Sequence, residues 1–181
     1  MPPQQARKKR SRRLDGYKLG LLHDLRRILL VAAGLVAVFC LLFGFSRVDG
    51  ESMLDTFQNG ELVFYSRING QIGVGDVVSV HLASGEYYIK RVVAVGGDEI
   101  DLRDGVLYVN GAPEEAGYVR NATYPEEGIV TYPYTVPEGD VFVMGDNREG
   151  STDSRTFGSV STRQVRGVIR FSVGWLYWHW H

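Results

Sequence analysis

Two kinds of hydrophobic pattern divide the chain. Residues 28–45 read ILLVAAGLVAVFCLLFGF, a run of 18 residues without a charge. A helix of that length covers roughly 27 Å, which is close to the thickness of the hydrocarbon core of a bilayer. We therefore predict a transmembrane helix over residues 28–45.

A cleaved signal peptide is the competing interpretation of this run. The apolar region of a signal peptide usually has only about 7–15 residues, and a cleavage site of the small-x-small type follows it. No such site follows Phe45, where the chain continues SRVDGES. The sequence therefore favours an anchor that remains in the protein.

Beyond residue 45, short runs rich in Val, Tyr and Ile alternate with turn signals such as Asp104-Gly105. This pattern is typical of β-sheets, and Asp-Gly is a frequent hairpin turn. The predicted strands are Glu61–Arg67, Asp76–His81, Glu86–Val95, Glu99–Arg103, Val106–Asn110, Val141–Gly145 and Val165–Val173. Asp104-Gly105 is expected to close a hairpin between the fourth and the fifth. The predicted fold class is mostly β, with one N-terminal transmembrane helix followed by an all-β domain.

Residues 112–139 interrupt the strand pattern. They hold four of the six prolines, and proline cannot donate a hydrogen bond to a strand ladder. We expect an irregular excursion or a β-ribbon inserted into the sheet system. The predicted organisation is a basic tail at 1–27, an anchor at 28–45 and a β-domain at 46–181.

The charge distribution predicts the orientation of the anchor. Residues 1–27 carry nine basic and two acidic side chains, so they sum to +7, whereas the rest of the chain sums to −8. Only Arg47 lies just beyond the apolar run, so the positive-inside rule places the N-terminus in the cytoplasm and residues 46–181 outside. No aromatic residue interrupts the basic run RKKRSRR, which favours contact with anionic lipid over nucleic acid.

Composition limits the chemistry of the β-domain. The only cysteine, Cys40, lies in the anchor, so residues 46–181 can form no internal disulfide and no cysteine zinc site. His179 and His181 alternate onto one strand face and could bind a metal, but a protein metal site usually needs more than two ligands. We expect neither a metal nor a cofactor.

Lys90 is the first candidate for catalysis. It is the only lysine among residues 46–181, where arginine occurs ten times, and lysine can lose its proton when buried. In EYYIKRVVAV, the period of two places Lys90 on one face with Tyr88, Val92 and Ala94. Burial there would lower the lysine pKa and free the amine to act as a base. A half-exposed strand lysine without a function is the alternative.

Ser52, in VDGESMLDTF, is the second candidate. It is one of ten serines beyond residue 45, so only its position distinguishes it. It follows Phe45 by seven residues, at most about 23 Å of extended chain, which keeps its hydroxyl near the membrane surface. A turn beside the membrane without a function is the alternative.

Three stretches, taken in order, resemble the bacterial type I signal peptidases, a family of membrane-anchored serine proteases with a Ser-Lys dyad on an all-β fold. GESMLDTF is similar to the nucleophile motif, IKRVVAVGGDEI to the motif of the general-base lysine, and VMGDNREGSTDSR to the third family motif. Together with the anchor, the resemblance covers most of the chain. It implies an endopeptidase of the bacterial plasma membrane that removes signal peptides from exported preproteins after a small residue.

The resemblance also implies site residues. Ser52 would be the nucleophile and Lys90 the base that takes its proton, while Ser151 would hold the lysine amine by a hydrogen bond. Met53 and Tyr88 would contact the substrate, Met53 in a shallow pocket for the small residue before the cut.

Two ion pairs are implied behind the dyad. Asp146 would pair with Arg91, and Asp153 with Arg155, as an electrostatic frame. Ordinary surface pairs, which contribute little, are the alternative.

Three positions depart from the family motifs. Asp55 and Gly96 stand where proline is common in the family. Gly50 stands where some members have a hydroxyl residue that helps to hold the oxyanion, so the backbone N–H of Ser52 is expected to act without it. Losing one oxyanion donor can raise the barrier by roughly 2.7–4 kcal/mol if nothing replaces it.

Other functions remain open. A Ser-His-Asp protease would need one of His81, His179 and His181, and none of them lies in a recognisable motif. His81 ends a predicted strand, and the other two belong to the extreme C-terminus. Asp55 and Gly96 would also suit a non-catalytic peptidase-like assembly or binding factor, and the dyad would suit a protease dedicated to one pilin-like or secreted substrate. The expected partners are preprotein signal peptides and the lipid bilayer, with no nucleic acid and no obligate protein partner.

The C-terminus holds all three tryptophans, Trp175, Trp178 and Trp180. Tryptophan favours the membrane interface, where its ring can be apolar and its N–H wet. We predict that this tip lies against the outer leaflet beside the anchor. Closure of the β-domain core is the alternative, above all for Trp175.

Overall fold

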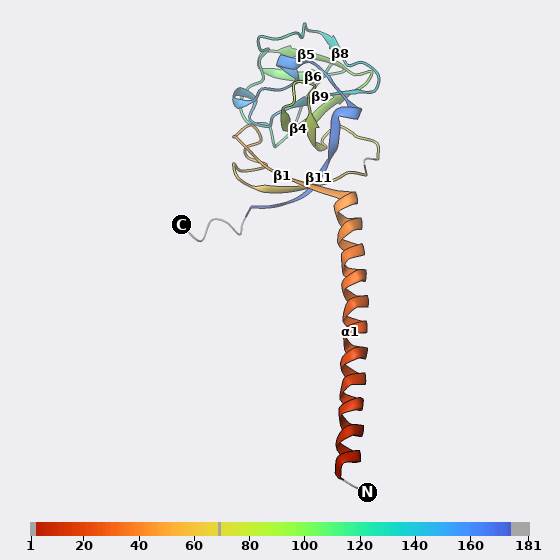
Figure 1. The fold of residues 1–181 in the computed structure, drawn as a ribbon. Coiled ribbons are helices and arrows are strands. Elements are labelled where there is room, and N and C mark those ends of the chain that lie inside the picture. The colour runs from red at the N-terminus through yellow and green to blue at the C-terminus, as the bar shows by residue number, and fades with distance from the viewer. Residues whose placement is uncertain (1–2, 69, 175–181) are drawn as a thin grey trace. The chain divides into compact units, whose positions relative to one another are not determined.

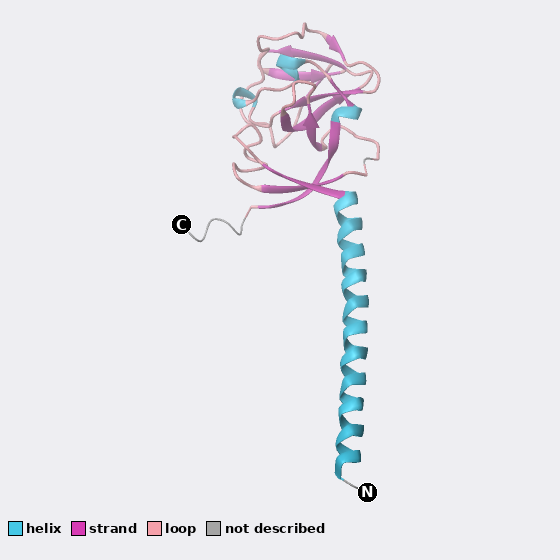
Figure 2. Ribbon diagram, viewed as in Figure 1, coloured by secondary structure: helices cyan, strands magenta, loops and turns pink. Residues whose placement is uncertain are grey.

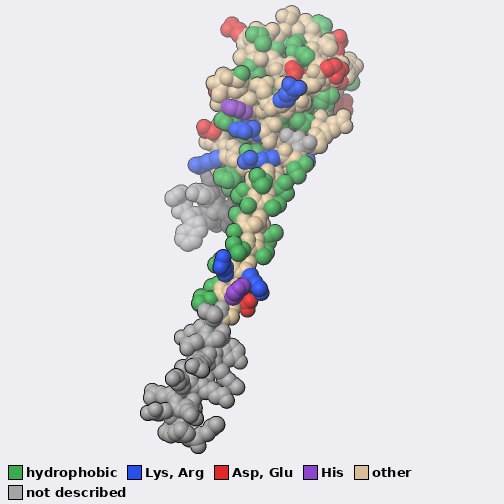
Figure 3. Space-filling view, turned by 45° about the vertical axis from the view of Figure 1, so that its right-hand side comes forward, with side chains coloured by type: hydrophobic (Ala, Val, Ile, Leu, Met, Phe, Trp, Pro, Cys, Tyr) green, Lys and Arg blue, Asp and Glu red, His purple; other side chains and the backbone are tan. Residues whose placement is uncertain are grey.

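A computed structural model of the chain describes residues 3–68 and 70–174, in two units, residues 1–41 and 42–181. In the first unit the structure describes the helix α1 (Pro3–Leu42), of 40 residues, whose last residue belongs to the second unit. Its segment Gly20–Leu42 is long and apolar enough to cross a membrane. Figure 3 shows hydrophobic side chains along this segment.

The helix that contains the predicted transmembrane segment is longer than residues 28–45 at its N-terminal end and stops three residues short of Phe45 at its C-terminal end. The helix begins at Pro3 and ends at Leu42, and Phe43–Arg47 form the strand β1, which pairs with β2 (Leu62–Ser66). Pairing satisfies the backbone groups of an apolar segment that could otherwise have continued the helix. Gly44 suits this strand because a Cβ there would lie 2.3 Å from the ring of Tyr65.

The second unit is built on a seven-stranded antiparallel sheet (Figures 1 and 2). The strand order is β1-β2-β11-β3-β4-β9-β10. The strands not yet given are β3 (Val77–His81), β4 (Tyr87–Val95), β9 (Asp140–Met144), β10 (Val160–Ser161) and β11 (Val165–Val173).

A smaller four-stranded sheet has the order β7-β6-β5-β8. Its members are β5 (Glu99–Arg103), β6 (Val106–Val109), β7 (Ala112–Pro113) and β8 (Tyr134–Thr135). In Figure 1, β5, β6 and β8 lie at the end of this unit away from β1 and β11. Apart from β7 and β8, residues 112–139 are irregular.

All seven predicted strands are present, each within one residue of its predicted bounds. The predicted hairpin is also confirmed, since Arg103 pairs with Val106 across Asp104 (φ 51°) and Gly105 (φ 78°). A two-residue hairpin turn of this type needs two left-handed residues. The sequence did not reveal β1 or the two-residue strands β7, β8 and β10.

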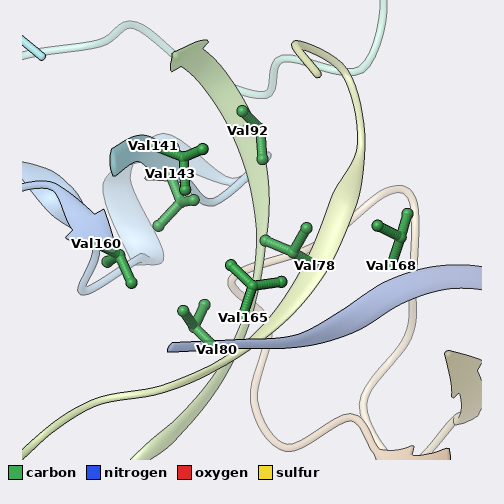
Figure 4. Close-up of a cluster of buried hydrophobic side chains, with 8 residues drawn as sticks. All are labelled: Val78, Val80, Val92, Val141, Val143, Val160, Val165 and Val168. Atoms are coloured by element: carbon green, nitrogen blue, oxygen red, sulfur yellow. The ribbon is translucent and has the colours of Figure 1, made fainter. Parts of the chain in front are cut away.

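Two clusters of buried apolar side chains form the core of the second unit. The first is made of valines from β3, β4, β9, β10 and β11, as Figure 4 shows. Its members are Val78, Val80, Val92, Val141, Val143, Val160, Val165 and Val168. The second cluster lies between β4, β9 and the smaller sheet and includes Ala94, Ile100 and Phe142. Short helices, Arg148–Gly150, α2 (Ser154–Phe157) and Thr162–Gln164, complete the unit.

A bulge in β4 corrects one prediction about side-chain faces. Alternation placed Ala94 on the face of Lys90 and Val92. The register with β9 shifts between Val92 and Ala94, so Val92 packs in the first cluster and Ala94 in the second. One extra residue in a strand reverses the alternation beyond it.

The predictions about the C-terminal tryptophans and about His179 and His181 concern residues 175–181, which lie outside the described residues.

Candidate active site

A cavity of about 240 Å³ opens beside Ser52 in the second unit. Residues 46–49, the last two of β1 and the two that follow it, form one side of it, and residues 87–90, at the start of β4, form the other. Ser52, Met53 and Ser79 complete the lining. The sheet therefore brings the two predicted catalytic segments to one cavity.

Lys90 and Ser52 meet at this cavity. Lys90 Nζ donates a hydrogen bond of 2.7 Å to Ser52 Oγ. Lys90 comes from the strand β4, whereas Ser52 lies in an irregular turn outside any helix or strand. A general base must lie within hydrogen-bond reach of the proton that it removes, and this pair meets that condition.

Lys90 is buried, with 2% of its surface exposed. Burial disfavours the ammonium form and lowers the pKa of Lys90 to about 8. The carboxylate of Asp153 opposes this shift, the guanidinium of Arg155 adds to it, and the carboxylates of Asp146 and Glu126 oppose it. Part of the amine is therefore neutral near pH 7–8 and can accept a proton.

The turn that carries Ser52 is held by the segment after β9. The backbone N–H of Asn147 donates to the Ser52 carbonyl at 3.0 Å, and Asn147 Nδ2 donates to the Glu51 carbonyl at 3.2 Å. Gly145 permits the contact, because a Cβ there would lie 2.6 Å from the Ser52 carbonyl oxygen and 2.3 Å from Ser151 Oγ. The position of the hydroxyl thus depends on residues almost a hundred positions away.

Arg91 and Asp146 join the strand of Lys90 to the turn of Ser52. Arg91 Nε and Nη2 donate to the two carboxylate oxygens of Asp146 at 2.8 and 2.7 Å. Thr56 donates to Asp146 and accepts from Arg91 Nη2 at 3.1 Å. The two charged side chains are 11% and 1% exposed, so this is a buried bidentate pair and not an ordinary surface pair.

The pair of Asp153 and Arg155 is buried more completely. Arg155 Nε and Nη2 donate to the carboxylate of Asp153 at 2.9 and 3.0 Å, and the side chains are 2% and 0% exposed. Asp153 also accepts from the N–H of Gly145 at 3.0 Å, and Arg155 forms an ion pair with Glu126 at 2.9 Å. Buried charges need such complete pairing, since each unpaired one is costly.

The hydrogen bond expected from Ser151 to the Lys90 amine is absent from the structure. Ser151 is 5% exposed, and its Oγ is buried without a hydrogen-bond partner. The hydroxyl packs against the backbone of Gly145, while the amine donates to Ser52.

The two predicted substrate contacts, Met53 and Tyr88, both line the cavity. Met53 is 1% exposed, so it forms part of a rigid wall. His81 is not part of the lining; its ring stacks on that of Tyr87, with the centroids 4.2 Å apart. Among the described residues, no three His, Cys, Asp or Glu side chains converge as metal ligands.

A group of residues that no sequence pattern predicted supports the site from the irregular segment. Arg148, which is 1% exposed, pairs with Glu114 at 2.7 Å and donates to Thr123 Oγ1 at 2.7 Å and to the Gly145 carbonyl at 3.0 Å. Arg120 donates its N–H to the Asp146 carbonyl at 2.8 Å. Arg148 could have been found from its place in the third motif, but no local pattern marks Glu114 or Thr123.

The departures from the family motifs have local explanations. Asp55 is exposed and pairs with Arg120 at 2.9 Å. A Cβ at Gly96 would lie 2.9 Å from the backbone of Pro137 and Glu138, so this chain requires glycine there. Gly50 has φ +91°, a left-handed conformation that residues with side chains rarely adopt.

Comparisons with known proteins bear directly on these motifs. Residues 22–175 match the family described as signal peptidase, peptidase S26. Signal peptidase I of Bacillus caldolyticus is 36% identical over 147 residues, which cover 72% of this chain and 80% of that protein. Signal peptidase IB of Staphylococcus aureus strain N315 is 33% identical over 141 residues, which cover 68% of this chain and 74% of that protein.

The fold gives the same result. A crystal structure of a signal peptidase I from Enterococcus faecalis V583 matches with a TM-score of 0.50 at 32% identity, covering 56% of this chain and 98% of that one. From the matched motifs, the curated relatives and the shared fold, we conclude that the chain belongs to the signal peptidase family, peptidase S26.

Proposed function

We propose that this serine endopeptidase removes signal peptides from exported preproteins by a Ser-Lys mechanism, with Ser52 as the nucleophile and Lys90 as the general base. The observation that carries the proposal is the buried amine of Lys90, 2.7 Å from Ser52 Oγ, with a pKa lowered to about 8. A neutral amine at that distance can take the serine proton directly.

In the first half of the reaction, Ser52 Oγ forms a bond to the carbonyl carbon of the scissile peptide while its proton passes to Lys90 Nζ. The resulting tetrahedral oxyanion collapses, the C–N bond breaks, and the Lys90 ammonium gives its proton to the leaving amine. The signal peptide is then held as an ester of Ser52.

In the second half, Lys90 takes a proton from water as the water oxygen attacks the ester carbonyl. The C–O bond to Ser52 breaks, and the serine oxygen recovers a proton from Lys90. The peptide is released as a carboxylic acid, and both side chains return to their starting states.

The substrate would bind as an extended chain. Residues 87–90 pair with β3 along one edge, while β9 pairs with β4 only from Arg91 onward, so among the described residues the other edge of 87–90 has no strand partner. Main-chain pairing at such an edge tolerates many sequences, which suits an enzyme that accepts unrelated signal peptides. The rigid wall at Met53 and Tyr88 would select small side chains before the cut.

The orientation is part of the proposal. The apolar helix segment and the family fit a membrane-anchored protein. With nine basic side chains in residues 1–27, the N-terminus would remain in the cytoplasm and the catalytic domain would face outward from the bacterial plasma membrane.

The test compares single variants of the detergent-solubilised full chain on a purified preprotein. Ser52→Ala and Lys90→Ala should each lower kcat/KM by at least about a thousandfold, because the two side chains serve one proton transfer. His81 lies outside the cavity lining, so His81→Ala is the matched control and should keep activity. A Lys90→Ala variant that remained active, or an inactive His81→Ala, would refute the dyad. A panel of preproteins would separate general processing from a protease with one substrate.

A further inference from the structure

Asn147 holds the peptide group that joins Glu51 to Ser52. Its carbonyl oxygen accepts from Asn147 Nδ2 at 3.2 Å, and the next carbonyl, that of Ser52, accepts from the Asn147 backbone N–H at 3.0 Å. One residue therefore holds the peptide groups on both sides of the nucleophile.

Two contacts fix the direction of the Ser52 N–H, since the Leu54 N–H donates to the same Glu51 carbonyl as Asn147 Nδ2, also at 3.2 Å. The peptide bond between Glu51 and Ser52 is trans, and in a trans peptide the C=O and the N–H point in opposite directions. Because the Glu51 carbonyl points at Asn147, the Ser52 N–H points away from it. No acceptor among the described residues receives this N–H, so it is free to bind an oxygen of the substrate.

The Asn147 side chain is itself oriented by the irregular segment. Asn121 Nδ2 donates to Asn147 Oδ1 at 3.1 Å, which leaves Asn147 Nδ2 to face the Glu51 carbonyl. The backbone on either side is held as well, since Arg120 donates its N–H to the Asp146 carbonyl at 2.8 Å and accepts from the Arg148 N–H at 3.1 Å. Asn147 is therefore a fixed donor.

The glycine at position 50 increases the importance of this donor. Gly50 has no hydroxyl to offer, and its φ of +91° disfavours any residue that could supply one. Stabilisation of the oxyanion then depends on the direction of a backbone N–H.

We propose that Asn147 is a positioning residue that aims the Ser52 N–H at the oxyanion of the tetrahedral intermediate. This inference rests on the proposed function, because it requires Ser52 to be the nucleophile. Asn147 is not among the residues that line the cavity, so it would act through the orientation of one peptide group.

The test uses Asn147→Ala and Asn147→Leu in the detergent-solubilised full chain, since leucine keeps the branched shape of asparagine without its donor. Both should lower kcat by about tenfold to a hundredfold with little change in KM, because removing a whole oxyanion donor costs about a hundredfold to a thousandfold. The pH dependence of kcat/KM should keep the wild-type midpoint, because Lys90 is untouched.

A peptide aldehyde provides a readout that a purely structural role would not move. Ser52 adds to its carbonyl carbon and leaves an oxyanion-like oxygen in the site. Asn147→Ala should weaken aldehyde inhibition by the same factor as it lowers kcat, while binding of a non-cleavable peptide of the same sequence stays unchanged. Asn59→Ala is the control. It removes the hydrogen bond from the Gly50 N–H to Asn59 Oδ1, at 3.1 Å, and should keep kcat within about threefold.

Equal losses of aldehyde and peptide binding, a shifted pH midpoint, or unchanged kcat in both Asn147 variants would overturn the inference. If Asn147→Ala does not fold, Asn147→Leu still decides the question. The quantity to compare is the ratio of its inhibition constants for the aldehyde and for the non-cleavable peptide, each measured per active site. Failure of the proposed function would look different, because Ser52→Ala would then remain active whatever happens at Asn147.

Discussion

The two members of the proposed dyad reach the cavity from different kinds of structure. Lys90 stands in the nine-residue strand β4, whose backbone is fixed by its ladder with β3. Ser52 stands in a turn without regular structure, and contacts from Asn147, Gly145 and Asp146 hold that turn in place. The strand buries the amine of Lys90, whereas the turn supplies a hydroxyl and a peptide N–H that no described residue accepts.

This difference predicts how each side responds to change. On the strand side, burial of an amine that prefers to be charged destabilises the folded protein. Removing the amine should therefore raise the free energy of unfolding. On the turn side, nothing regular defines the backbone, so small displacements should impair the chemistry before they unfold the domain.

Gly145→Ala tests the turn side most severely. The new Cβ would lie 2.6 Å from the Ser52 carbonyl oxygen and 2.3 Å from Ser151 Oγ, so the turn must move. A displacement of about 1 Å can cost about a hundredfold, so kcat/KM should fall by at least that factor. The free energy of unfolding should fall by about 1–3 kcal/mol. Gly117→Ala is the matched control, because no atom lies within 4 Å of the added Cβ. A fully active Gly145→Ala would show that the turn tolerates displacement.

Lys90→Met tests the strand side. The folded state holds the pKa of Lys90 at about 8, below its ordinary value of 10.5, so the unfolded chain binds more protons between these values. The variant should be inactive but more stable than wild type by about 3 kcal/mol at pH 7. Because wild-type stability rises between pH 8 and 10.5, the difference in stability between the variant and wild type should close at pH 10.5. Denaturant unfolding of the full chain at both pH values measures this. An equally large gap at both values would exclude burial of the charge as its cause.

The same pKa predicts the dependence of the rate on pH. Only the neutral amine acts as a base, so kcat/KM should fall about tenfold per pH unit well below pH 8 and level off above it. Lys90→Arg should be inactive at every pH, since arginine stays charged. A rate that is flat from pH 6 to pH 9 would mean that deprotonation of Lys90 does not limit the reaction.

The exposed pair of Asp55 and Arg120 should show the smallest effect. Their side chains are 83% and 46% exposed, and surface ion pairs contribute at most about 1 kcal/mol. Asp55→Ala, Arg120→Ala and the double variant should therefore keep kcat/KM within about fivefold of wild type. A larger, non-additive loss would place this pair among the contacts that hold the nucleophile turn.

Local patterns alone determined seven of the eleven strands in the described residues, the hairpin at Asp104-Gly105 and the apolar segment of the anchor. Alternation also gave the faces of Tyr88, Lys90 and Val92, because side-chain direction in a regular strand follows from the backbone. The motifs indicated the family, and the two ion pairs that they imply are both present.

Only the tertiary structure decided the end of the helix at Leu42, the bulge before Ala94, the unpartnered Ser151 and the contact of Asn147 with Glu51. Each depends on a partner far away in the chain. The helix gives way to the strand β1 after Leu42 because β2 is available to pair with β1. Asn147 meets the carbonyl of Glu51, 96 residues earlier, because the folded sheet brings the two segments together. Sequence periodicity reports the local backbone, and it carries no record of which distant atoms the folded chain brings within hydrogen-bond reach.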